Sequence, residues 1–164
     1  MQITEPATMV TDYVITAWCV VLAVKLRRKL PLAGPVQLWI WVFWVTALAA
    51  LAGGTAHGFK LYLEGPALAA IWTLTVAAIG ASAALAVAAS VRSYQHSYLP
   101  AAHRDSARRL WQAGVFVSMA GVAVQQSGWG LHQHFNHNDI YHLIQIVGLY
   151  YFYRFALHLR PSGE

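Results

Sequence analysis

The chain has 164 residues, of which 58% are apolar and only 10% are charged, and its net charge is +5. A soluble domain usually contains about 25% charged residues, so the composition predicts a membrane protein and argues against a soluble globular domain. The basic residues stand at the ends of apolar segments and form no free arm, which argues against a nucleic-acid partner and favours contact with lipid headgroups.

Five apolar segments are long enough to cross about 30 Å of hydrocarbon, which takes roughly 20 residues of helix. They are residues 8–26, 36–59, 66–91, 109–130 and 140–158. Their apolar runs are continuous rather than alternating, which predicts helices and not the strands of a barrel. The predicted fold is therefore all-α, a polytopic membrane bundle of about five transmembrane helices in a single domain, residues 1–164. The many small residues of the third segment predict that it is the central, tightly packed helix.

The basic residues predict the orientation of the bundle. Ten of the eleven fall on one membrane face: Lys25, Arg27, Arg28, Lys29, Arg92, Arg104, Arg108, Arg109, Arg154 and Arg160. Only Lys60 belongs to the other face. Because short cytoplasmic loops carry an excess of Lys and Arg, the N-terminus is predicted outside and the C-terminus in the cytoplasm. The expected location is a bacterial inner membrane, with the outer face toward the periplasm.

This topology gathers acidic residues and histidines from distant parts of the chain at the outer face. They are Glu5, Asp12, His57, Glu64, His132, His134, His137, Asp139 and His142. Asn138, His142 and Gln145 share one helical face by their spacing, and polar side chains inside a span usually point into the bundle and mark a site. Asp139, three residues before His142, is predicted to hold the second nitrogen of that imidazole.

Imidazole and carboxylate groups at this density suit zinc, and also copper or iron. The absence of a nearby thiolate or thioether in the sequence favours zinc. The predicted metal ligands are His57, His134, His137 and His142. Asp12 or Asp139 is the predicted general base. The alternative is that the histidines of the 130–139 link lie in a hydrated loop and bind nothing.

Two stretches of the chain resemble a known group of membrane hydrolases. They are "GGTAHGF", with Thr55 and His57, and "NDIYHLI", with the Tyr141–His142 step. In these the chain resembles the superfamily of alkaline ceramidases, progestin/adiponectin receptors and GPI-anchor lipid-remodelling proteins. The resemblance implies zinc held by histidines and cleavage of a lipid amide or ester.

The chain also departs from the pattern of that superfamily. Asn138 stands four residues before His142, where the superfamily has a histidine, and the hydroxyl precedes His57 by two residues instead of about four. No Asp lies in the third span, so Asp12 or Glu64 would have to replace it. The chain has five predicted spans, whereas the superfamily has seven.

The predicted function is that of an integral membrane, zinc-dependent hydrolase acting on a lipid amide or ester at the outer leaflet, with membrane lipids as its partners. The alternative is a non-catalytic metal- or haem-binding subunit of a larger complex, or a homo-oligomer. A haem site between His142 and His158 is disfavoured, because at about 100° per residue they face different sides of one helix. The apolar middle of three spans disfavours a permeation path for metal ions or protons.

Overall fold

The structure is a computed structural model that describes residues 2–30, 34–95, 98–132 and 135–159. Its elements are α1 (Pro6–Lys29), α2 (Pro35–Phe59), α3 (Gly65–Gln95), the short 3₁₀ helix η1 (Ala101–His103), α4 (Arg104–Ser127) and α5 (His137–Ala156). The all-α prediction is confirmed, and each predicted span overlaps one of the five long helices. All five helices begin before the predicted spans, because an apolar stretch marks the segment suited to hydrocarbon and not the end of the hydrogen-bonded helix. At the other end α4 and α5 stop at Ser127 and Ala156, short of the predicted limits of 130 and 158.

Proline, glycine and an asparagine cap set several helix limits. Pro6 and Pro35 begin α1 and α2, where the amide that proline lacks would have no partner in the helix. Gly128 ends α4 with a φ of 68°, a left-handed conformation that glycine adopts without steric cost. At the start of α5, Asn136 accepts from the Asn138 amide and Asp139 accepts from the Asn136 amide, which makes a capping box.

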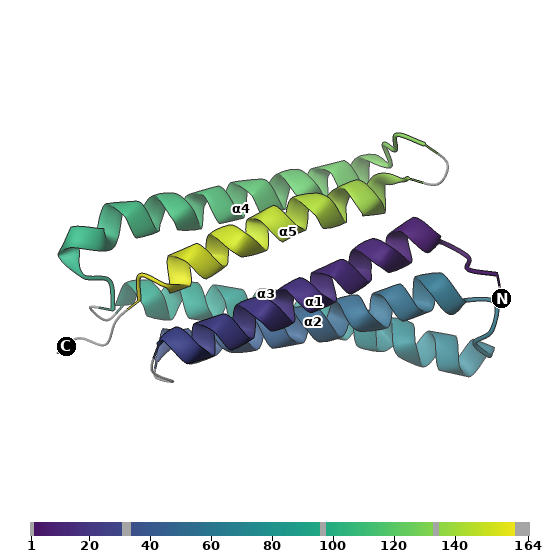
Figure 1. Cartoon of the computed structure of the whole chain (residues 1–164), viewed down its shortest axis with the longest axis horizontal. Coiled ribbons are helices and arrows are strands. Elements are labelled where there is room, and N and C mark those ends of the chain that lie inside the picture. The colour runs from purple at the N-terminus through teal and green to yellow at the C-terminus, as the bar shows by residue number, and fades with distance from the viewer. Residues whose placement is uncertain (1, 31–33, 96–97, 133–134, 160–164) are drawn as a thin grey trace.

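The five long helices form two groups (Figure 1). Helices α1, α2 and α3 pack in chain order, with α2 in the middle, and α4 and α5 form an antiparallel hairpin. The hairpin joins the three-helix group through α5, which contacts α1 and, over a smaller area, α2. It also joins through α4, where Trp111 Nε1–H donates to Ser90 Oγ of α3 at 2.9 Å. The interface between α1 and α5 therefore connects the beginning of the chain with its last helix.

A cluster of aromatic side chains fixes the hairpin at the end of the bundle where α2 begins. Trp39 is fully buried, stacks on Phe152 at 5.3 Å between ring centroids, and meets the edge of Phe155 at 5.7 Å. Such aromatic contacts contribute about 0.5–1.5 kcal/mol each beyond the burial of their area. They tie α2 to α5 at one end, and polar contacts connect α1 to α5 at the other.

The central helix is α2 and not α3, so the prediction for the third span is wrong. In the most apolar stretch of α2, 56% of the residues are buried, whereas in the corresponding stretch of α3 only 17% are buried. Small residues permit close approach but do not determine which helix approaches. A side chain at Gly80 of α3 would meet open space, whereas Gly54 and Gly58 of α2 lie directly against α1.

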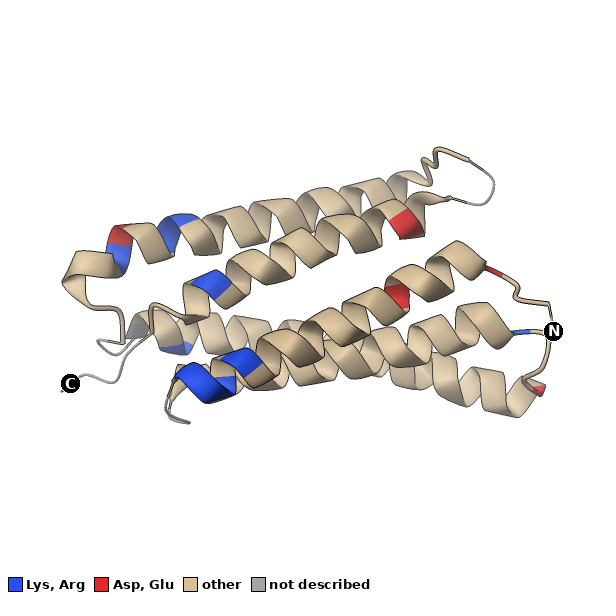
Figure 2. Ribbon diagram, viewed as in Figure 1, with Lys and Arg blue, Asp and Glu red and all other residues tan. Residues whose placement is uncertain are grey.

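Three of the described helices are long and apolar enough to cross a membrane: α1, α2 and α3. The first turns of α4 and α5 carry polar and charged residues that lower their hydropathy. Charge separates along the bundle (Figure 2). We call the end where α1, α3 and α5 begin the acidic end, with Glu5, Asp12, Glu64 and Asp139, and the opposite end, where α2 and α4 begin, the basic end.

Candidate functional site at the acidic end

The α1–α5 interface holds a chain of polar side chains, the Thr11–His142–Asp12 array. The Nδ1 atom of His142 lies 2.8 Å from Thr11 Oγ1, and its Nε2 atom lies 3.3 Å from Asp12 Oδ1. Asp12 and His142 are both buried, and Thr11 is half-buried. The array therefore joins the first and last helices through one imidazole whose two nitrogens are both engaged.

The hydrogen count of the array allows two arrangements. In the first, the Thr11 hydroxyl donates to the Thr8 carbonyl at 3.0 Å and accepts from Nδ1–H of His142, which leaves one proton shared between Nε2 and Asp12. In the second, the Thr11 hydroxyl donates to Nδ1, and Nε2–H donates to the Asp12 carboxylate. The second arrangement orders a hydroxyl, an imidazole and a carboxylate as nucleophile, base and orienting acid.

Glycines of α2 make room for Asp12. A Cβ atom at Gly54 would lie 2.9 Å from Asp12 Cβ, and one at Gly53 would lie 3.4 Å from Asp12 Oδ2. Two residues after Gly54, Ala56 is buried, and at Gly58 a Cβ would collide with Met9 of α1. The "GGTAHG" stretch thus lets α1 approach α2 closely, as small residues do between helices in lipid.

Asp139 does not hold the imidazole of His142 as the sequence predicted. Its Oδ2 accepts from the Asn136 amide at 2.7 Å, so this oxygen belongs to the cap of α5. Asp12 takes the predicted place beside His142, because the α1–α5 packing brings its carboxylate to Nε2. Asp139 is fully buried, and its Oδ1 has no hydrogen-bond partner among the described residues.

His57 has partners of its own and does not join His142. Its Nδ1 lies 3.1 Å from Glu5 Oε2, and its ring meets the edge of Trp72 on α3 at 5.7 Å between centroids. These residues line a pocket of about 390 Å³ between the end of α2 and the start of α3. Thr55 faces α1, where its hydroxyl lies 3.2 Å from that of Tyr13.

The predicted zinc site is not formed by the part of the chain that the structure describes. Within it, no three His, Cys, Asp or Glu side chains are grouped so that they could hold a metal ion. His57 and His142 contact different carboxylates, and His137 is the first residue of α5. His134 lies outside the described residues, so the zinc site remains a prediction.

Sequence reasoning missed two residues of the acidic end, Thr11 and Trp72, and it missed the contact between Glu5 and His57. The sequence did contain one signal for Thr11. Thr8, Asp12, Ile15 and Cys19 recur at helical spacing and form the buried face of α1, which places Thr11 beside that face. Nothing in the local sequence links Trp72 or Glu5 to His57, because both contacts arise from packing between separate segments.

Fold and site together define a class: a helical, membrane-type bundle with a buried hydroxyl–imidazole–carboxylate array between its first and last helices. A family of unknown function (DUF6962) matches residues 7–100 and 94–161, and the chain belongs to this family. No curated protein matches the chain. No solved structure matches it either.

Proposed function

We propose that all five long helices cross the membrane, with the acidic end outside and the basic end in the cytoplasm. Three helices support this by length and composition, and α5 packs beside α1 along the bundle. Exposed apolar side chains on α4, among them Phe116 and Met119 at 75% and 67% exposure, suit lipid contact. The positive-inside rule sets the direction. In a bacterial inner membrane the acidic end would face the periplasm.

We further propose that the acidic end hydrolyses an amide or ester bond of a lipid. The observation that carries this proposal is the position of His142 between the Thr11 hydroxyl and the Asp12 carboxylate. Thr11 lies five residues into α1, about 8 Å along the helix from its start. That depth is near the level of the bonds that join headgroups to acyl chains.

In the proposed reaction, Thr11 Oγ1 attacks the carbonyl carbon while its proton passes to Nδ1 of His142. The carbonyl π electrons move to oxygen. When the tetrahedral intermediate collapses, the bond to the leaving group breaks and the amine or alcohol takes the proton from Nδ1. Water then attacks the acyl-threonine in the same way and releases the acid. Asp12 holds Nε2–H throughout and stabilises the imidazolium as it forms.

This route is written without zinc and is distinct from the zinc site that the sequence predicts. The reaction above uses only the hydroxyl, imidazole and carboxylate of the array. Metal content nevertheless distinguishes this route from the zinc hydrolase that the sequence resemblance implies.

The test is hydrolysis of lipid esters and amides by the purified chain in proteoliposomes. Thr11→Val, His142→Gln and Asp12→Asn should each lower the rate at least about 10³-fold, while Thr11→Ser should retain turnover. His103→Gln, at the basic end, is the matched histidine control and should be unaffected. The proposal would be contradicted if the purified protein bound one zinc ion per chain and lost its activity on chelation, and if the Thr11→Val variant remained fully active.

A second candidate function is structural. Both nitrogens of His142 are engaged in a buried setting, as expected of a group that locks α5 against α1 within a larger assembly. In that case the array variants would lower stability and no lipid in the panel would be hydrolysed.

A further inference from the structure

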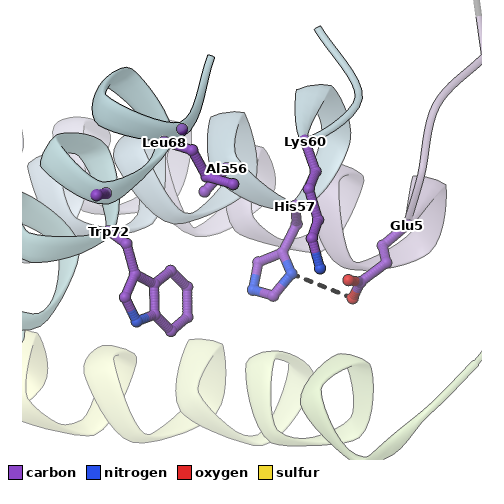
Figure 3. A pocket seen from close by; sticks show the side chains of 8 residues that line it. Glu5, Ala56, His57, Lys60, Leu68 and Trp72 are labelled. Carbon is purple, nitrogen blue, oxygen red and sulfur yellow. Dashed lines mark hydrogen bonds and ion pairs between the residues drawn. The ribbon is translucent and has the colours of Figure 1, made fainter. Parts of the chain in front are cut away.

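The pocket beside His57 has polar side chains on one side, which we call its mouth, and apolar side chains on the other, which we call its floor (Figure 3). Glu5, His57 and Lys60 are drawn side by side, and Trp72 lies across from them. The walls are completed by Ala56, Leu68, Ala69 and the backbone of Gly65. Its volume of about 390 Å³ falls within the range of roughly 300–1,000 Å³ of small-molecule sites.

The mouth of the pocket presents one cation and one anion. Lys60 is exposed in the turn after α2, whereas the other Lys and Arg residues that the structure describes belong to the links and helix turns of the basic end. Glu5 is partly exposed and gives one oxygen to His57. A carboxylate has about four acceptor positions, so Glu5 can accept further hydrogen bonds from an ammonium group.

The apolar floor continues along α3 away from the mouth. Leu68, Trp72, Val76 and Ile79 follow one another at spacings of four, four and three, so they share one helical face. Trp72, Val76 and Ile79 are 48%, 55% and 54% exposed. Eleven residues of helix span about 16 Å, which is close to half of the roughly 30 Å hydrocarbon core.

We propose that this pocket binds a zwitterionic phospholipid, with the lipid phosphate at Lys60, the headgroup ammonium at Glu5, and one acyl chain along the Leu68–Ile79 face of α3. The polar-to-apolar order of the site matches the order of groups in such a lipid. Trp72 lies between the two regions, where its indole can contact both headgroup and chain. The inference goes beyond the hydrolase proposal and does not depend on Thr11.

The test is native mass spectrometry of the full chain in detergent, in a Thr11→Val background so that no bound lipid is consumed. The probes are phosphatidylethanolamine, phosphatidylcholine, phosphatidylglycerol and diacylglycerol with identical acyl chains. The two ammonium lipids should bind about tenfold more tightly than phosphatidylglycerol, and diacylglycerol should bind most weakly, since charge-assisted hydrogen bonds are the strong ones.

Two variants test which charged side chain contacts which part of the lipid headgroup. Glu5→Gln should remove the preference for ammonium lipids over phosphatidylglycerol, and Lys60→Gln should bring all three phospholipids toward diacylglycerol. Glu64→Gln and Lys29→Gln are the matched controls, being exposed and outside the pocket lining. The proposal would be overturned if the four lipids bound equally tightly or if the control variants changed lipid binding as much as the pocket variants do. Displacement of the bound lipid by soluble phosphoethanolamine alone would also overturn it.

Discussion

Asp12 is the residue on which the geometry of the acidic end depends. Its carboxylate reaches Nε2 of His142, and its Cβ rests against the backbone of Gly54. A buried carboxylate is costly unless it is paired or protonated, and an intramembrane one is costly for the same reason. The pairing with His142 meets that requirement and fixes α1 and α5 relative to one another.

The pair should show strong energetic coupling. Asp12→Asn and His142→Gln should each lower the free energy of unfolding in an SDS titration by about 3–5 kcal/mol, because each leaves a buried partner uncompensated. The double variant should lose less than the sum, with a coupling of roughly 1–3 kcal/mol. Additive losses would show that the two side chains do not interact.

Asp139 should behave differently from Asp12, although the sequence predicted a catalytic role for both. Asp139→Asn keeps an oxygen that can accept from the Asn136 amide, so the cap of α5 should survive. Both stability and lipid hydrolysis should stay close to wild type. If hydrolysis falls as far as in Asp12→Asn, then Asp139 is required for the reaction as well as Asp12.

The sequence predicted Asp12 and His142 as candidate site residues, but it placed Asp139 and not Asp12 beside the imidazole of His142. Helical spacing shows that Asp139 and His142 share a face of one helix. It does not show that a separate helix will bring Asp12 closer to the imidazole. His57 was likewise recognised, but its contacts with Glu5 and Trp72 depend on tertiary packing.

Among the elements, α1 and α2 lie close together because glycines of α2 face α1. A Cβ at Gly58 would overlap Met9, and one at Gly54 would lie 2.9 Å from both Asp12 and Tyr13. Because the Asp12 side chain is carried on α1, a small displacement of α1 alters the array. The glycines of α2 therefore support the site without belonging to it.

Gly54→Ala should destabilise the bundle by about 1–3 kcal/mol, as overpacking of a core does, and should also impair the array. Gly80→Ala is the matched control. It adds the same methyl group to a helix interior that faces open space, so it should be neutral or stabilise by up to about 1 kcal/mol. Thermal unfolding in detergent compares the two. Equal effects would mean that α1 does not depend on Gly54.

The five helices were predictable because continuous apolar runs and proline or glycine punctuation are local signals. The order in which the helices pack could not be predicted from the sequence. Composition gave α3 the small residues expected of a central helix, yet its Gly80 faces outward while Gly54 and Gly58 meet α1. Which helix is central depends on how all five pack together, and no local signal reports that.

For the whole molecule, the separation of charge predicts one orientation in the membrane (Figure 2). Single cysteines introduced in a Cys19→Ala background report on it. Glu64→Cys, at the acidic end, should react with an impermeant maleimide in intact cells, and Arg108→Cys, at the basic end, only after permeabilisation. The reverse pattern would place the site in the cytoplasm. Labelling of both in intact cells would contradict an odd number of spans.

The proposed hydrolysis requires Thr11 to be a nucleophile activated by His142 and Asp12. Its most direct test is the site of covalent modification by a lipid-like fluorophosphonate. Peptide mass spectrometry should find the adduct on Thr11, with labelling lost in Thr11→Val and His142→Gln and retained in Thr11→Ser. An adduct on any other residue, or unchanged labelling in His142→Gln, would contradict the account.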